Sequence, residues 1–93
     1  MVYYVYLILS KKISKYRSYV GYTNDVEKRL KLHNSSKGAK FTKGAKWDVI
    51  YVKKYDDKKD AMKEEYKLKK NYKLRKQIIT KYLNDENFNS PSL

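Results

Sequence analysis

Three ionisable side chains fall on the apolar faces of two predicted helices, where charged residues are seldom buried without a partner. In a helix expected over residues 25–33, Arg29 and His33 lie on or beside the apolar stripe, one turn apart on the same face. In a second helix, expected over residues 58–70, Glu65 lies inside the apolar stripe. An arginine, a histidine and a carboxylate that turn inward together suit the hydrolysis of a phosphodiester.

That reaction needs a hard cation, a positive group for the charge that develops on the phosphate, and a base for water. A carboxylate such as Glu65 can hold the cation together with waters, and Arg29 supplies a guanidinium fork for the phosphate. Tyr6 and Tyr19, on two neighbouring predicted strands, are candidates for the base. Because a tyrosine hydroxyl has a reference pKa of about 10, it acts as a base only beside a metal or cation that lowers this pKa.

Each of these side chains also has a purely structural explanation. Arg29 can extend its charged end to solvent at the edge of the core, and His33 can be a hydrogen-bonded core residue. A buried ion pair between Glu65 and Arg29 would satisfy both charges. The chain holds 11 tyrosines, and a strand tyrosine is usually a core residue whose hydroxyl reaches the rim. Geometry on a helical wheel leaves the structural and the hydrolytic explanations open.

The patterning of apolar residues predicts the elements that must position these side chains. We expect strands over residues 3–9, 19–22 and 47–55, and helices over residues 25–33, 58–70 and 73–83. The order β-β-α-β-α-α favours an α+β fold in which helices flank a small three-stranded antiparallel sheet. Residues 1–83 would form a single domain, and residues 84–93 a flexible C-terminal tail.

Polar segments mark the ends of the predicted elements. Residues 10–18 have the composition of a long hairpin loop, and residues 35–46 form a second loop that is rich in glycine and lysine. Asn24 predicts the N-cap of the first helix, with Glu27 completing a capping box, and Asn34 is a C-terminal stop signal.

The charge of the chain indicates a polyanionic partner. The 93 residues carry 23 Lys and Arg against 10 Asp and Glu, a formal net charge of +13, which favours binding to nucleic acid. An AT-rich genome can produce a similar bias toward lysine. With one histidine and no cysteine, the chain excludes a disulfide framework and a His/Cys zinc site. The longest apolar run, residues 2–9, is far shorter than the ~20 residues of a membrane span, so we expect a cytoplasmic protein.

Short motifs along the chain resemble those of the GIY-YIG endonucleases, in particular the short stand-alone bacterial proteins related to structure-specific, junction-cleaving members. The motifs read YVY at residues 4–6, YVG at 19–21, TNDVEKRL at 23–30 with HN at 33–34, GAKFT at 38–42 and AMKEEYKLK at 61–69. Each fragment is short, but their order and spacing over residues 3–83 are jointly specific.

The resemblance implies roles for the inward-facing residues. Tyr6 and Tyr19 would be the motif tyrosines, and one of them, undecided from the sequence, would be the general base. Arg29 would stabilise the transition state, and His33 would contact phosphate or orient a tyrosine. Glu65 would hold one Mg²⁺ or Mn²⁺ ion. Attack by water would leave a 5′-phosphate and a 3′-hydroxyl.

The chain departs from the family pattern at the start of the first motif, where Tyr4 takes the place of a glycine. A glycine there would allow a close approach of the backbone. The sequence alone does not decide whether Tyr4 at this position changes activity. Some family members also use a C-terminal asparagine at the site. Asn71 is the nearest candidate in this chain.

Basic and polar residues outside this set are expected to contact nucleic acid. They are Lys37, Lys40, Thr42, Lys43 and Lys69. Phe41 or Trp47 could stack on a base. Alternatively, the loop is an ordinary solvated one and Trp47 lies in the core.

The expected function is that of a divalent-metal-dependent DNA endonuclease of low sequence specificity, which acts on single-stranded or branched DNA in repair or recombination. DNA would be its partner, with or without an accessory protein subunit, and it would have access to the nucleoid and no contact with the membrane. The alternative is a non-catalytic DNA- or RNA-binding module of the same fold, whose tyrosines stack on bases. Glu65→Ala separates the two, because it would abolish cleavage and leave binding intact or stronger.

Overall fold

A computed structural model describes residues 1–12 and 15–88 of the chain. Within them lie the strands β1 (Tyr3–Lys12), β2 (Lys15–Thr23) and β3 (Asp48–Tyr55), and the helices α1 (Val26–Asn34), α2 (Lys58–Lys70) and α3 (Tyr72–Phe88). A short 3₁₀ turn, η1 (Lys40–Thr42), lies in the loop between α1 and β3. This order confirms the expected α+β fold, and α2 has the bounds that its pattern predicts.

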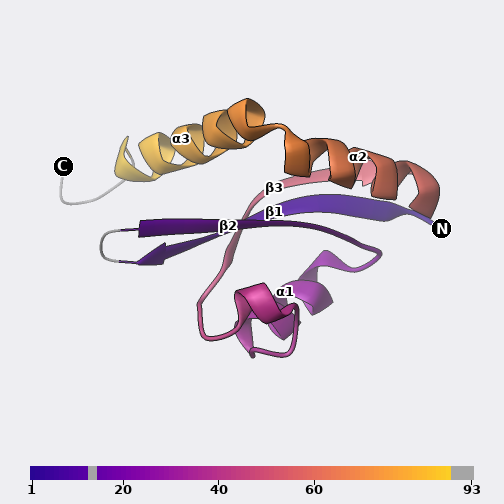
Figure 1. Cartoon of the computed structure of the whole chain (residues 1–93), viewed down its shortest axis with the longest axis horizontal. Coiled ribbons are helices and arrows are strands. Elements are labelled where there is room, and N and C mark those ends of the chain that lie inside the picture. Colours follow the sequence, from indigo (N-terminus) through magenta and orange to yellow (C-terminus); the bar gives the residue numbers. More distant parts are fainter. Residues whose placement is uncertain (13–14, 89–93) are drawn as a thin grey trace.

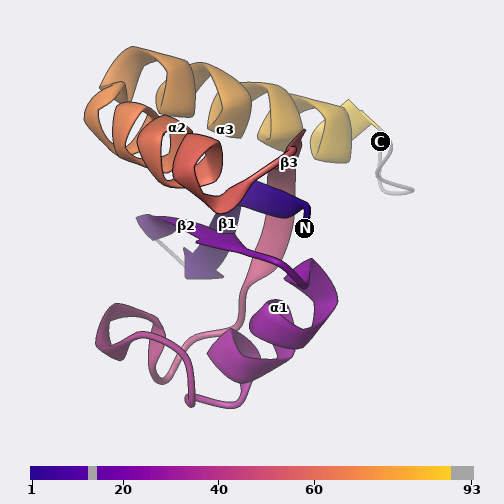
Figure 2. The same ribbon diagram turned by 90° about the vertical axis from the view of Figure 1, so that its right-hand side faces the viewer.

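The strands form one antiparallel sheet in the order β2-β1-β3. Helices α2 and α3 lie along one face of the sheet, while α1 and the loop after it lie on the other (Figure 1). Figure 2 shows the same three layers from the side. Strand β1 takes the central position because residues 5–9 are apolar or aromatic on both faces, and each of them is at most 2% exposed.

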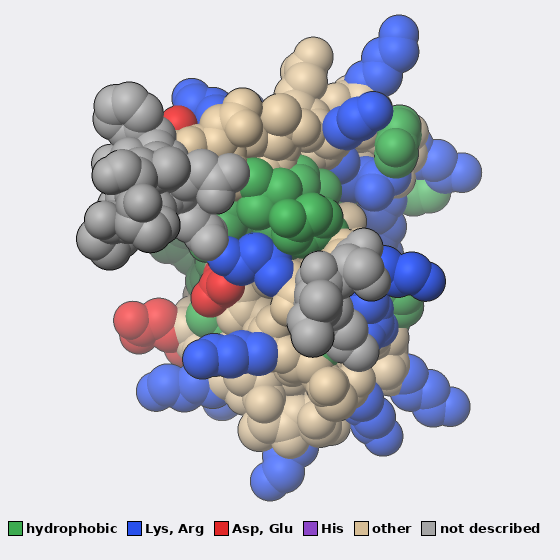
Figure 3. All heavy atoms as spheres, turned by 90° about the vertical axis from the view of Figure 1, so that its left-hand side faces the viewer, with side chains coloured by type: hydrophobic (Ala, Val, Ile, Leu, Met, Phe, Trp, Pro, Cys, Tyr) green, Lys and Arg blue, Asp and Glu red, His purple; other side chains and the backbone are tan. Residues whose placement is uncertain are grey.

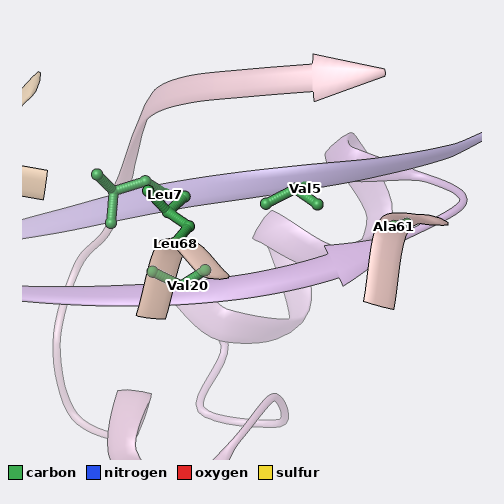
Figure 4. Packing of buried hydrophobic residues seen from close by; sticks show 5 residues of the cluster. All are labelled: Val5, Leu7, Val20, Ala61 and Leu68. Carbon is green, nitrogen blue, oxygen red and sulfur yellow. The ribbon is translucent and has the colours of Figure 1, made fainter. Parts of the chain in front are cut away.

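Alternate residues of β1 build a separate core on each face of the sheet. The core on the α2 side consists of Val5, Leu7, Val20, Ala61 and Leu68 (Figure 4). On the α1 side, Tyr6 and Ile8 pack with Trp47, which is only 1% exposed. Trp47 is therefore a core residue, and of the two aromatics in this loop only Phe41 remains on the surface.

The hairpin of β1 and β2 is longer than expected, and the prediction of a long loop over residues 10–18 is wrong. Ser10 pairs with Arg17, and the ladder continues to the pair Lys12 and Lys15. An antiparallel ladder is built from backbone hydrogen bonds, so it can extend through polar residues that apolar patterning reads as loop. Residues 13 and 14 lie outside the described part of the chain.

The N-cap of α1 is Asp25 and not Asn24. The Asp25 side chain accepts a hydrogen bond from the backbone N–H of Lys28 at 3.1 Å. Strand β2 continues to Thr23, whose hydroxyl accepts from the backbone N–H of Asp25 at 3.1 Å. The helix therefore starts one residue later than expected, and Glu27 is no longer at the position that a capping box requires.

Two further differences concern β3 and α3. The pairing of β3 with β1 shifts between Leu7 and Ile8, so that Ile50 and Tyr51 both pack on the α2 side, where strict alternation predicts opposite sides. Helix α3 runs to Phe88, beyond its expected end, and only residues 89–93 of the expected tail lie outside the described residues. None of the helices described here combines the length and the apolar character that crossing a membrane requires.

Candidate active site

A cleft of about 350 Å³ opens at the edge of the sheet that β2 forms. Its lining residues come from β1, β2, α1, α2 and the β2–α1 turn: Tyr3, Tyr6, Tyr19, Gly21, Tyr22, Thr23, Asn24, Arg29, Lys58 and Glu65. Helices α1 and α2 lie on opposite faces of the sheet (Figure 2). The guanidinium of Arg29 and the carboxylate of Glu65 therefore meet in one cleft only because β2 is an edge strand.

A chain of buried hydrogen bonds leads away from the cleft behind Tyr6. The Tyr6 hydroxyl lies 2.8 Å from Nε2 of His33, and Nδ1 of His33 lies 2.9 Å from the hydroxyl of Thr42. The Thr42 hydroxyl donates to the backbone carbonyl of Ala39 at 2.8 Å. Since a carbonyl can only accept, Thr42 must accept from Nδ1–H, which leaves Nε2 as the acceptor for the Tyr6 proton.

Two glycines give these side chains their space. Gly21 pairs with Tyr6 across the β1–β2 ladder, and a Cβ atom at position 21 would collide with the Tyr6 hydroxyl and ring. A Cβ atom at Gly38 would lie 2.5 Å from Nδ1 of His33 and 3.1 Å from its Cα. The glycines of the YVG and GAKFT motifs thus allow the tyrosine and the imidazole to lie directly against the backbone.

The environment sets the protonation states of Tyr6 and His33. Burial raises the pKa of the Tyr6 hydroxyl to about 12, although the neighbouring Arg29 acts in the opposite direction. Burial, and then the positive charge of Arg29, lower the pKa of His33. Tyr6 is therefore protonated and His33 neutral near pH 7, as the direction of the hydrogen bonds requires.

Arg29 lies beside both motif tyrosines. Hydrogen bonding to the Tyr6 hydroxyl raises the pKa of Arg29, burial opposes this to a smaller extent, and interactions with Tyr19 add to it. The Tyr19 ring lies 6.5 Å from the Tyr6 ring and 5.1 Å from the imidazole of His33, measured between ring centroids. The guanidinium is thus a fixed positive charge at the point where the tyrosines meet the cleft.

Glu65 is not paired with Arg29. Its carboxylate lies 3.4 Å from Nζ of Lys69, and no ion pair among the described residues joins it to Arg29. The neighbouring Glu64 forms an ion pair with Lys67 at 3.1 Å and does not line this cleft. Of the two explanations that the sequence leaves open for Glu65, the buried ion pair with Arg29 is wrong.

The donor atoms of the cleft fit a Mg²⁺ or Mn²⁺ ion that is held mainly by water and substrate. Among the residues that the structure describes, no group of three or more His, Cys, Asp and Glu side chains could hold a metal ion by itself. Mg²⁺ commonly keeps several waters and uses one or two carboxylates together with substrate phosphates. Glu65, whose side chain is 14% exposed, supplies one such carboxylate at the wall of an open cleft.

The expected nucleic-acid contacts divide into exposed and buried residues. Lys37, Lys40 and Lys43 lie exposed on the loop after α1, and Lys69 lies next to Glu65. Thr42 is fully buried at 0% exposure and holds His33. The prediction that Thr42 contacts nucleic acid is therefore wrong for this structure, because its hydroxyl is already committed inside the protein.

Two asparagines make hydrogen bonds that the sequence does not predict. The side chain of Asn71 caps α3 by accepting from the backbone N–H of Leu74 at 3.1 Å, and it does not line the cleft. Asn34 does more than end α1, since its side chain accepts from the backbone N–H of Trp47 at 2.6 Å and donates to its carbonyl at 3.2 Å. Asn34 thereby fastens the start of β3 to the helix that carries His33.

Lys58 also lines the cleft, although its position in the sequence does not mark it as a site residue. It precedes Glu65 by seven residues on α2, so both project from nearly the same side of the helix. The helical spacing that identifies Glu65 as inward-facing also places Lys58 on that side of α2. A lysine at the first position of a helix is usually solvated, so this spacing alone does not mark Lys58 as a site residue.

The chain is similar to a known family of catalytic domains and to several bacterial proteins. The family model described as the GIY-YIG catalytic domain matches residues 2–78. The chain is 46% identical over 67 residues to a UPF0213 protein of Oceanobacillus iheyensis, covering 71% of this chain and 74% of that protein. It is 38% identical over 89 residues to a UPF0213 protein of Clostridium perfringens, covering 91% of each. The solution NMR structure of a UPF0213 protein from Bacillus halodurans is 36% identical, with a TM-score of 0.47 over 86% of this chain and 84% of that chain. The chain belongs to the GIY-YIG catalytic domain family.

Proposed function

We propose that this chain is a divalent-metal-dependent DNA endonuclease of low sequence specificity that acts on single-stranded or branched DNA. One observation carries the proposal: Tyr6 lines the cleft, and its hydroxyl donates a hydrogen bond to the neutral, buried imidazole of His33. Any buried tyrosine hydroxyl needs a hydrogen-bond acceptor, but here the acceptor is an imidazole that can take up the proton, and the guanidinium of Arg29 also contacts the hydroxyl. Membership of a family of catalytic domains supports the same class of activity.

In this proposal, Tyr6 and His33 act together as the base for water. Tyr6 alone is a poor base, because its pKa of about 12 keeps it protonated. As the Tyr6 oxygen takes a proton from the attacking water, it passes its own proton to Nε2 of His33, 2.8 Å away. This path favours Tyr6 over Tyr19 as the base.

The phosphate would lie against Arg29, whose guanidinium neutralises the charge that develops on the phosphate oxygens. The water oxygen forms a bond to phosphorus while the bond from phosphorus to the 3′ oxygen breaks. The 3′ oxygen then takes a proton from solvent, which leaves a 3′-hydroxyl and a 5′-phosphate. Glu65 would hold one Mg²⁺ or Mn²⁺ ion, which supplies positive charge that polarises the phosphate when it is bound.

The charge of the surface supports DNA as the substrate. The face shown in Figure 3 carries many Lys and Arg side chains and few acidic ones, in keeping with the net charge of +13. Lys37, Lys40 and Lys43, which are exposed on the loop after α1, would contact phosphates of the bound strand. Such contacts position the backbone without reading bases, so we propose low sequence specificity and a role in repair or recombination, where single-stranded and branched DNA arise.

One observation favours the second candidate, a binding module without catalysis. The ion pair between Glu65 and Lys69 already satisfies the carboxylate, so a metal would have to compete with a lysine. The exposed side chain of Lys69 can turn away from Glu65 toward a phosphate, which reconciles the pair with the proposed nuclease.

The decisive experiment compares two adjacent glutamates. Labelled single-stranded, duplex, flap and four-way-junction DNA would be incubated with wild type, Glu65→Gln and Glu64→Gln, in Mg²⁺, in Mn²⁺ and in chelator. We expect metal-dependent cleavage by wild type and Glu64→Gln, and none by Glu65→Gln, which should still bind DNA. Both glutamates are paired with a lysine, so Glu64→Gln controls for loss of charge and of an ion pair. Binding without cleavage by wild type on every substrate would contradict the proposal.

A further inference from the structure

Phe41 is a large apolar side chain that the fold leaves on the surface. It is 51% exposed and lies in η1, between the exposed Lys40 and the buried Thr42. The proposed mechanism does not use it, and its exposed part contributes nothing to the core. The loop around it carries the exposed Lys37 and Lys43, so the ring lies in a strongly basic surrounding.

The ring of Phe41 begins a row of aromatic side chains that leads to the cleft. It is nearly parallel to the ring of Tyr19, with an interplanar angle of 23° and 6.3 Å between centroids. Tyr19 in turn lies 6.5 Å from Tyr6. A group that rests on Phe41 is therefore two rings away from the hydroxyl that we propose as the base.

Phe41 is also held firmly in place. The guanidinium of Arg17 lies 4.6 Å from the centre of the Phe41 ring, and it donates a hydrogen bond to the Phe41 carbonyl. Trp47 lies against the ring at 6.4 Å. These contacts fix the ring before any ligand arrives, which lowers the entropy lost on binding.

We propose that Phe41 is a platform on which an unpaired nucleobase of the bound DNA strand stacks, next to the phosphate in the cleft. Every base has a flat π-face, and exposed aromatic side chains within a basic groove bind single strands by stacking on it. The guanidinium of Arg17 lies over the same ring, so the base would stack on the part of the ring that remains exposed, and Arg17 supplies a positive charge for the neighbouring phosphate. The proposal rests on the proposed function, because it assigns the strand in the cleft as DNA.

The consequence is a preference for unpaired bases near the cut. In a blunt duplex the bases are stacked on one another, and presenting one to Phe41 requires unstacking and unpairing. A single strand or a branch point already offers a free base. Phe41 would therefore select among DNA structures, whereas the lysines of the loop would attract all of them.

The test measures binding in chelator, where no cleavage can occur, by fluorescence anisotropy with a labelled single strand and a blunt duplex of equal length. We expect Phe41→Ala and Phe41→Leu each to weaken single-strand binding by about tenfold, and Phe41→Trp to retain it. Duplex binding should change little in all three. Tyr66→Ala is the matched control, because Tyr66 is 60% exposed and also has a cation, Lys70, 5.3 Å over its ring.

Phe41→Leu and Phe41→Trp separate the loss of stacking from a local loss of structure, since both keep an apolar side chain against Trp47. The platform would be overturned if Phe41→Leu bound the single strand with wild-type affinity. It would also be overturned if the variants lost affinity equally for the single strand and the duplex. The readout is independent of cleavage. If the wild type cleaves no DNA but the Phe41 variants lose single-strand binding, the nuclease proposal fails and the stacking platform stands. If the wild type cleaves DNA but the Phe41 variants bind single strands normally, the platform fails and the nuclease proposal stands.

Discussion

The two faces of the sheet use the same central strand in different ways. On the α2 side, Val5 and Leu7 of β1 enter a core made only of apolar side chains (Figure 4). On the α1 side, Tyr6 begins a chain of polar groups that continues through His33 and Thr42. The burial is equally deep, since these three polar residues are at most 2% exposed. Within the described residues, no buried side-chain nitrogen or oxygen lacks a hydrogen-bond partner.

The difference assigns stability mainly to the α2 side of the sheet and, in the proposed function, proton transfer to the α1 side. Apolar burial is non-directional and stabilises in proportion to the area removed from water. A buried polar chain is directional, and removal of one member leaves its neighbour unsatisfied. We therefore expect changes on the α2 side to lower the free energy of unfolding, and changes on the α1 side to alter proton transfer first.

The largest effect is expected for Tyr6→Phe, which keeps the ring and removes the hydroxyl that donates to His33. Cleavage should fall by about 10²–10⁴-fold, the usual contribution of a positioned general base. The free energy of unfolding should fall by only about 1–3 kcal/mol, because Nε2 of His33 loses its partner. Single-turnover cleavage and urea unfolding measure the two quantities.

Tyr22→Phe is the matched control for Tyr6→Phe. Tyr22 also lines the cleft, but it packs against the apolar core on the α2 side. It should retain cleavage. Cleavage near the wild-type rate by Tyr6→Phe would remove Tyr6 as the base and direct attention to Tyr19.

Leu7→Ala tests the apolar face. Leu7 is fully buried, so its truncation should lower the free energy of unfolding by about 2–5 kcal/mol through lost burial and the cavity that remains. At a temperature where the variant stays folded, cleavage should remain close to wild type. Loss of cleavage by the folded variant would show that the two faces of the sheet are coupled and do not act separately.

Thr42→Val removes the acceptor for Nδ1–H of His33 at nearly constant volume. We expect unfolding to become easier by about 1–3 kcal/mol, because a buried donor is left without a partner. Nitrogen NMR of the imidazole should show a mixture of tautomers, and cleavage should fall to a level between wild type and Tyr6→Phe. Thr42→Ser, which keeps the hydroxyl, should restore the single tautomer. An unchanged tautomer in Thr42→Val would contradict the assigned hydrogen-bond direction.

The smallest effect concerns pH. The pKa of His33 is lowered in the folded protein, whereas the unfolded chain has the ordinary value of about 6.5. Below about pH 6.5 the unfolded state therefore binds a proton that the folded state does not, and stability falls with a slope of at most about 1.4 kcal/mol per pH unit. Above that pH the contribution of His33 is fully present. Urea unfolding of wild type and His33→Gln across this range should show the slope only in wild type, and the same slope in both would exclude His33 as its source.

Much of the local structure could be predicted from the sequence. Helix α2 begins and ends where its pattern predicts, since Asp57 caps it and its few apolar residues recur with helical spacing. Helical spacing also identified Arg29, His33 and Glu65 as inward-facing, and the structure places His33 in the interior and the other two in the cleft. The hairpin was predicted less well, because its outer half pairs through the backbone while its side chains are polar.

What the sequence determined by itself is therefore the set of elements and the face of each helix that turns inward, because both depend on spacing along one segment. Only the tertiary structure decided which residues meet. It buried Thr42 behind His33, and it brought Glu65 and Arg29 from opposite sides of the sheet to one edge without pairing them. Such meetings depend on the order of the strands and on how helices pack across the sheet, and no local pattern encodes those distances.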